Sequence, residues 1–148
     1  MDEKPTINDM MVAYAQDAVD YALQNFKITL DYSVESIDKI EAIAAQLHST
    51  LQPGGLGKLF KKGPSAEQID KICKMLGGYV GEVYRRQKGG EWGINDKFKA
   101  IGISRGGLWI FPPAKIHKRL TNGKEDDIWF YFRVLMNPPT AAQRTTGS

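Results

Sequence analysis

The residues best suited to chemistry lie in one short segment that ends at Trp92. The segment holds two carboxylates, two adjacent arginines and a tryptophan, namely Glu82, Arg85, Arg86, Glu91 and Trp92. Arginine recognises planar polar groups through a bidentate guanidinium, and tryptophan offers a large contact area at little entropic cost. This combination favours recognition of a partner surface.

The spacing within this segment leaves two interpretations open. Glu82 and Arg86 are four residues apart, in the orientation that favours an ion pair on a helix. In the first interpretation Arg86 is buried against Glu82 and Trp92 and locks the fold. In the second, Arg86 is exposed and the patch binds a partner. The glycines nearby favour the lock, because they indicate tight packing.

Three glycines occur within five positions of the helix expected here, Gly77, Gly78 and Gly81. A glycine inside a helix costs roughly 0.5–1 kcal/mol relative to alanine, so something must offset three of them. Gly77 and Gly81 are one turn apart and share a face, which Cys73 extends as a strip of small residues. This strip predicts either close packing of another backbone or a shallow groove, and packing is favoured.

The same segment resembles a widespread bacterial family of domains without an established activity. The resemblance rests on Leu-Gly-Gly-Tyr-Val-Gly-Glu-Val at 76–83, then Arg86 and Gly-Gly-Glu-Trp at 89–92. It extends to Leu-Asp-Tyr-Ser-Val-Glu-Ser-Ile at 30–37 and to Lys-Arg-Leu-Thr-Asn-Gly at 118–123 with Glu-Asp at 125–126. It covers most of the chain, roughly from Tyr32 to Phe132. Some relatives are found among polymorphic-toxin immunity proteins, so the resemblance implies a protein that neutralises a toxin by binding it.

Signatures of enzymes and metal sites are missing from the sequence. Residues 54–58 read Gly-Gly-Leu-Gly-Lys, but Leu59 stands where a phosphate loop needs Ser or Thr for magnesium. His48 and His117 belong to no metal-binding pattern. We therefore expect no catalytic residue, no cofactor and no metal ion, and a protein that is not an enzyme.

The distribution of charge offers a second route to a partner. The chain carries a net charge of +3, but residues 1–51 hold nine acids and three bases, and the remainder holds the other eight acids and seventeen bases. Either the halves neutralise each other within the fold, or one face carries a coherent field for a charged partner. The acidic candidates for such a face are Asp31, Glu35, Asp38 and Glu41.

Nucleic-acid binding is the alternative class, and an enzyme of unrecognised type is the third. A glycine-rich loop is expected over 52–64. Basic residues of this loop and of a later helix would form a patch, and Trp109 and Phe111 would offer rings for stacking. The two rings share one face of a strand, which more often belongs to the core. The basic candidates are Lys58, Lys61, Lys62, Lys115, Lys118 and Arg119.

Length and composition indicate one α+β domain over residues 1–139 and a disordered tail over 140–148. No run of about 18 apolar residues occurs, so no membrane partner is expected. The N-terminus lacks a basic and apolar leader, and Cys73 has no second cysteine, which favours the cytoplasm and a buried, unreactive thiol.

Apolar periodicity and capping residues predict the elements. Helices are expected over 7–26, from Ser33 to 51 and over 66–88, with an extended segment over 27–32. Strands are expected over 91–94, 100–104 and 108–111, where Pro112-Pro113 ends the last one. A short helix over 114–120 and a final helix begun by Glu125, Asp126 and Asp127 complete the chain. The expected fold has three to four main helices packed on one side of a small antiparallel sheet.

Overall fold

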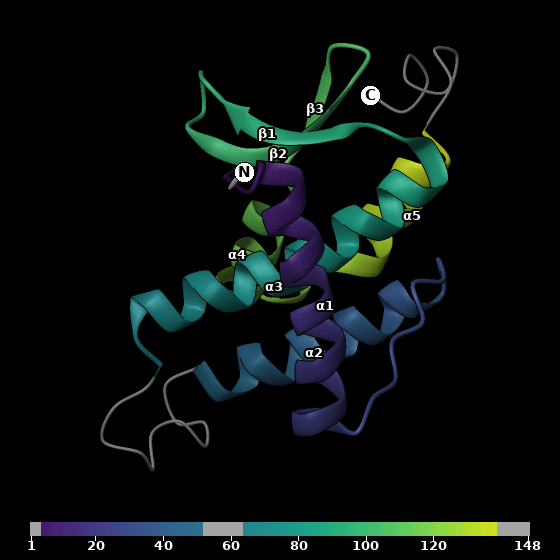
Figure 1. Ribbon diagram of the computed structural model, residues 1–148. Coiled ribbons are helices and arrows are strands. Elements are labelled where there is room, and N and C mark those ends of the chain that lie inside the picture. The colour runs from purple at the N-terminus through teal and green to yellow at the C-terminus, as the bar shows by residue number, and fades with distance from the viewer. Residues whose placement is uncertain (1–3, 52–63, 139–148) are drawn as a thin grey trace.

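The computed structural model describes residues 4–51 and 64–138, which form five α-helices and a three-stranded sheet. In Figure 1 the sheet lies at the top of the view and the helices lie beneath it. The fold is α+β, as the sequence predicts. The elements, in chain order, are α1 (Ile7–Phe26), α2 (Ser36–Leu51), α3 (Ala66–Lys88), β1 (Glu91–Asn95), β2 (Ala100–Arg105), β3 (Leu108–Ile110), α4 (Pro112–Asn122), η2 (Lys124–Asp126) and α5 (Ile128–Met136). The expected glycine-rich loop and C-terminal tail lie outside the described residues.

Helix α3 is the central element, and its bounds follow from its caps. Ser65 and Gln68 form a capping box at its start, and Gly89, at a φ of 86°, ends it. Every residue from Met75 to Tyr84 is buried, because α1 and α4 pack on α3 from different sides and the sheet covers its C-terminal half. A helix enclosed in this way holds the rest of the fold together.

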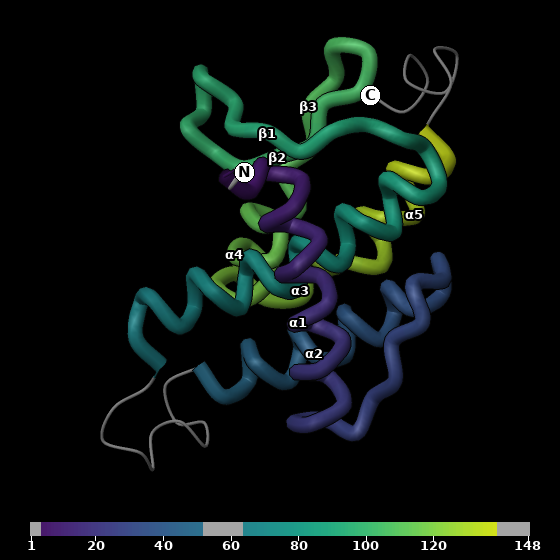
Figure 2. The backbone as a smooth tube through the Cα atoms, in the orientation of Figure 1, coloured from purple at the N-terminus to yellow at the C-terminus, as the bar shows by residue number. Residues whose placement is uncertain are grey.

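The connection between α1 and α2 is not a strand. Residues 27–32 were expected to be extended, but Lys27 and Tyr32 have φ angles of 59° and 63°, in the left-handed region. Tyr79 from α3 fixes this connection with its hydroxyl group, which accepts a hydrogen bond from the Tyr32 amide at 2.7 Å and lies 2.6 Å from Ser36 Oγ. The Tyr32 amide therefore bonds to a side chain, where in a sheet it would bond to a neighbouring strand. Figure 2 follows the connection from the end of α1 to the start of α2.

The sheet is antiparallel, in the order β1-β2-β3. Its inner face carries Trp92, Ile103 and Ile110, which lie opposite one another on the three strands and are buried. Strand residues alternate between the two faces, so Trp109 and Phe111 belong to the outer face. The inner face packs on the C-terminal half of α3.

The two C-terminal helices begin at residues that suit helix starts. Pro112 and Pro113 end β3, as expected, but they also occupy the first positions of α4, where proline loses no hydrogen bond. Asp127 caps α5 by accepting a hydrogen bond from the Phe130 amide at 2.7 Å. None of the described helices is both long and apolar enough to cross a membrane.

Candidate functional site

Glu82 lies at the centre of a buried hydrogen-bonded group. Only 7% of Glu82 is exposed, and one of its oxygens accepts a hydrogen bond from Trp92 Nε1 at 2.9 Å. The same oxygen binds Arg85 Nη1 at 2.7 Å, and Arg85 Nε donates to the carbonyl of Gly90 at 3.0 Å. These contacts tie the end of α3 to the start of β1. Glu82, Arg85 and Trp92 are therefore a structural lock, which we call the Glu82 lock.

The expectation that Arg86 is buried in this lock is wrong. Arg86 is exposed, and its guanidinium carbon lies 3.8 Å from the centre of the Tyr32 ring. Arg85 takes the place beside Glu82 that was expected for Arg86. The Gly89-Gly90 turn explains this, because it brings the Gly90 carbonyl within hydrogen-bond distance of Arg85 and so fixes the Arg85 side chain. Tyr32, from the connection between α1 and α2, offers its ring to Arg86 instead.

The three helical glycines each admit a different neighbour. A Cβ atom at Gly81 would overlap the six-membered ring of Trp92, and one at Gly77 would lie 2.5 Å from the Cα atom of Pro113 in α4. At Gly78 a Cβ atom would lie 3.1 Å from the carbonyl oxygen of Met11 in α1. The prediction that Gly81 is a packing position is confirmed, and the glycines bring the sheet, α4 and α1 close to one helix.

A second buried ion pair joins the acidic and basic halves of the chain. Arg119, only 4% exposed, binds both carboxylate oxygens of Glu41 at 2.8–3.1 Å. Glu41 also accepts a hydrogen bond from the Ile128 amide at 2.9 Å, so this one side chain links α2, α4 and the start of α5. Glu41 and Arg119 thus hold helices together.

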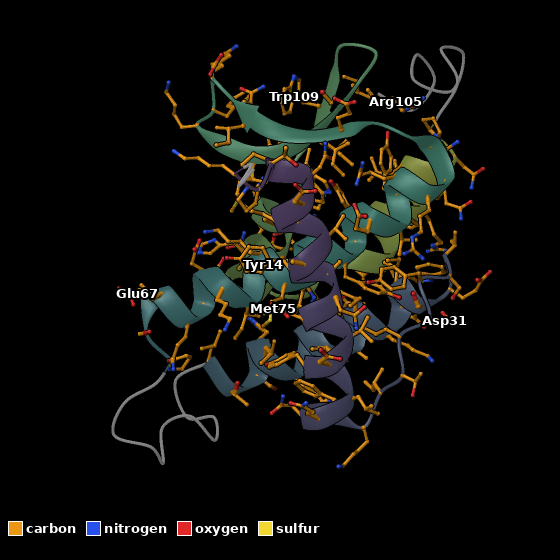
Figure 3. All side chains as sticks on the ribbon, in the orientation of Figure 1. Tyr14, Asp31, Glu67, Met75, Arg105 and Trp109 are labelled. Carbon is orange, nitrogen blue, oxygen red and sulfur yellow. The ribbon has the colours of Figure 1, made fainter. Side chains whose placement is uncertain are left out.

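The other candidate acids lie on the surface. Asp31, Glu35, Asp38 and Glu91 are all exposed. The amide of Ser33 donates to Asp31 at 3.0 Å, and hydrogen bonds from Ser33 lower the pKa of the Asp31 carboxyl. Asp31 belongs to the connection between α1 and α2, and Figure 3 shows it far from Trp109 on the sheet. The candidate residues are therefore spread over separate parts of the fold.

A hollow lined by aromatic rings and lysines lies where the sheet meets α4 and α5. Its volume is about 470 Å³. We call it the aromatic hollow and define it by Phe98, Trp109, Phe111, Lys115, Lys118 and Tyr131. Trp109, Phe111 and the two lysines were candidates for nucleic-acid binding, and the structure brings these four together. The sequence does not single out Phe98 or Tyr131 as candidates. Phe98 could have been found, because an aromatic residue in the turn between two expected strands is a visible signal.

Glycines in the neighbouring strands explain how these rings are placed. A Cβ atom at Gly102 would lie 2.7 Å from the Phe111 ring, and one at Gly93 would lie 3.5 Å from the Trp109 ring. The two rings are nearly parallel, at an interplanar angle of 11° with centres 6.0 Å apart, and each lies against bare backbone. Phe98 meets Phe111 edge-on at 5.6 Å. The result is a shelf of rings on the outer face of the sheet.

The expected basic patch is only partly formed among the described residues. Lys115 pairs with Asp126 at 3.0 Å and lies 5.3 Å from the centre of the Tyr131 ring. Arg119 is buried with Glu41 and does not belong to the patch. The remaining candidates, Lys58, Lys61 and Lys62, lie outside the described residues. Burial raises the pKa of Tyr131, so its phenol stays neutral at the edge of the hollow.

The adjacent arginines provide a test of the lock. Arg85→Ala removes the partner of a buried carboxylate, so we expect a loss of about 2–3 kcal/mol in the free energy of unfolding. Arg86→Ala removes only an exposed cation–π contact, for which we expect about 0.5–1 kcal/mol. Urea denaturation of both variants measures the difference. Equal losses, or a larger loss for Arg86→Ala, would contradict the assignment of Arg85 to the lock.

Chemical sites of other kinds do not emerge from the described residues. Within residues 4–51 and 64–138, no three side chains of His, Cys, Asp or Glu are grouped so as to hold a metal ion. His48 is partly buried, and its Nδ1 lies 2.7 Å from the carbonyl oxygen of Leu120.

Comparison with models of protein families, with curated proteins and with solved structures finds no match, so the family resemblance stays a prediction from the motif.

Proposed function

We propose that this chain is a non-enzymatic protein-binding domain and that the aromatic hollow is its binding site. The observation that carries the proposal is the exposure of Phe98, 62% of which is open to solvent beside Trp109 and Phe111. A large exposed apolar side chain next to further rings is typical of an interaction surface, where aromatic residues supply most of the binding energy.

The charges around the aromatic hollow favour an acidic partner. Lys97 lies 5.5 Å from the centre of the Phe98 ring, and Lys118 lines the hollow. Asp126 neutralises Lys115, so Lys97 and Lys118 contribute the net positive charge. A partner that presents a carboxylate beside an apolar or aromatic side chain would match both the rings and the lysines.

The finer form of the proposal concerns the partner's identity. The motif resemblance supports a bacterial toxin domain, which this chain would neutralise as its cognate immunity protein in the cytoplasm. The experiment is to express the product of the neighbouring gene in a bacterial host, with and without this chain. Growth arrest that this chain relieves, together with a purified complex of the two proteins, would support the proposal. Arrest that this chain does not relieve would contradict it.

Two phenylalanines with the same exposure allow a matched test of the site. Phe98 and Phe130 are each 62% exposed, but only Phe98 lines the aromatic hollow. We expect Phe98→Ala to reduce the binding free energy of the partner by about 2 kcal/mol or more, as truncation of a hot-spot residue does. We expect Phe130→Ala to leave the affinity unchanged. Titration calorimetry measures both, and thermal melting shows whether the variants stay folded. Equal effects of the two variants on affinity would rule out the aromatic hollow as the binding site.

Nucleic-acid binding is the second candidate, and the near-parallel rings of Trp109 and Phe111 favour it. Aromatic rings on an open sheet face beside lysines are suited to stacking of single-stranded bases. Binding of a short single-stranded oligonucleotide at several salt concentrations tests this candidate. An affinity that falls steeply with salt and is lost in Trp109→Ala would support it. No binding at low salt would rule it out.

A further inference from the structure

A second hollow lies on the other side of the β2–α4 contact, separate from the aromatic hollow. Its volume is about 560 Å³, within the range of small-molecule sites. It is lined by the first half of α3, the start of β2 and α4. We call it the lysine hollow and define it by Cys73, Lys74, Lys99, Ile101, Pro113 and His117. We propose that the lysine hollow binds a small organic carboxylate with an apolar body.

The floor of the lysine hollow supplies the apolar contacts. Ile69 and Ile101 come from α3 and β2, and Pro113 comes from α4, where it packs closely on Gly77. Cys73 also lines the hollow and is buried, and burial raises the pKa of its thiol to about 12. The thiol is therefore neutral at physiological pH and acts as another apolar contact. This floor suits a hydrocarbon or aromatic portion of a ligand.

The rim of the lysine hollow carries a positive excess. Lys74 and Lys99 contribute two positive charges, and Asp70 contributes one negative charge through its pair with Lys74 at 2.9 Å. His117 adds a ring nitrogen that can donate a hydrogen bond. No ion pair of Lys99 is found within the described ranges, so its charge is available to a ligand. A carboxylate placed between Lys74 and Lys99 would form charge-assisted hydrogen bonds.

The turn before β2 sets the position of Lys99 at the rim. Its φ angle is 53°, in the left-handed region, and its amide donates to the Asn95 carbonyl at 2.8 Å. Lys27 and Tyr32 adopt the same region in the connection between α1 and α2, so this conformation belongs to a tight connection of the chain. The turn therefore fixes the backbone of Lys99 beside the lysine hollow.

The inference goes beyond the proposed function and can fail separately from it. Ala100 and Ala114 line both hollows, so the two sites are adjacent. Of these two hollows, Phe98 lines the aromatic hollow alone, and Lys74 and Lys99 line the lysine hollow alone. Variants of one set therefore test one site. Loss of partner binding in Phe98→Ala does not bear on the carboxylate, and the reverse also holds.

The test uses 3-phenylpropanoate and its neutral counterpart 3-phenylpropanamide as probes. The intact chain is titrated with each compound and followed by amide chemical shifts in two-dimensional NMR. We expect the carboxylate to shift residues of the lysine hollow and to bind about 10-fold more tightly than the amide, because only the carboxylate forms an ion pair with the lysines, whereas the amide oxygen only accepts hydrogen bonds from them. Equal affinity of the two probes, or shifts elsewhere only, would overturn the proposal, and so would no binding at 10-millimolar probe, a concentration of about the order expected to saturate a weak site.

Matched lysine variants complete the experiment. Lys74→Met and Lys99→Met each keep an unbranched side chain one atom shorter and remove the charge, and we expect each to weaken the binding of 3-phenylpropanoate about 5-fold or more. Lys71→Met is the control, because Lys71 is exposed on the same helix and does not line the hollow. A similar affinity in all three variants would assign the binding to general surface charge and overturn the proposed site.

Discussion

Gly81→Leu is expected to lower the free energy of unfolding by at least about 3 kcal/mol, near the upper end of overpacking effects. Even the first atom of the new side chain would overlap the Trp92 ring and would lie 2.9 Å from Ile103 Cδ1. Trp92 cannot move aside freely, because it is buried and its Nε1 donates to Glu82. Displacing the ring would also open the Glu82 lock.

Helix propensity acts in the opposite direction but is too small to compensate. Replacing a helical glycine with leucine gains less than about 1 kcal/mol. Gln87→Leu is the control, because Gln87 is exposed near the end of the same helix and should change stability by no more than about 0.5 kcal/mol. Gly81→Ala should fall between the two. Urea denaturation with a constant m value measures all three, and a Gly81→Leu variant as stable as the wild type would show that the sheet does not pack closely on α3.

Glu41→Ala is expected to cost about 3–5 kcal/mol, the range for breaking a buried ion pair. The substitution leaves the Arg119 guanidinium buried without its carboxylate, and the Nη1 atom of Arg119 already has no hydrogen-bond partner among the described residues. It also removes the acceptor of the Ile128 amide at the start of α5. Three helices therefore lose their common contact in one step.

A double variant separates the lost pair from the orphaned charge. Glu41→Ala combined with Arg119→Met removes both charges, so the combination should be more stable than Glu41→Ala alone. Asp70→Ala serves as the control for an exposed pair, because its salt bridge with Lys74 lies on the surface and should contribute no more than about 1 kcal/mol. If Glu41→Ala and Asp70→Ala had the same small effect on thermal melting, the Glu41–Arg119 pair would not hold the helices together.

The sequence by itself determined the elements that depend on neighbours within four residues. A capping box predicts the start of α3, and the apolar repeat predicts the extent of both α1 and α3, so Ile7–Phe26 and Ala66–Lys88 follow from local pattern. The Arg105-Gly106-Gly107 turn likewise predicts the pairing of β2 with β3. The three glycines predict close packing, since their cost in a helix must be offset.

Only the tertiary structure decided which distant residue each side chain meets. Arg85 and Arg86 are both one turn from Glu82, and the choice between them depends on the Gly90 carbonyl and on Tyr32, 54 positions away in the chain. Glu41 has several cations available in the basic half, and the approach of α4 to α2 selects Arg119.

Trp109 and Phe111 share a face of the sheet because strand residues alternate between faces. That face is the outer one, because Trp92 and Ile103 occupy the side that packs on α3. Periodicity relates residues on one element to each other, while the packing of whole elements sets the contacts between them, and that packing depends on the sum of many weak contacts that no short segment encodes.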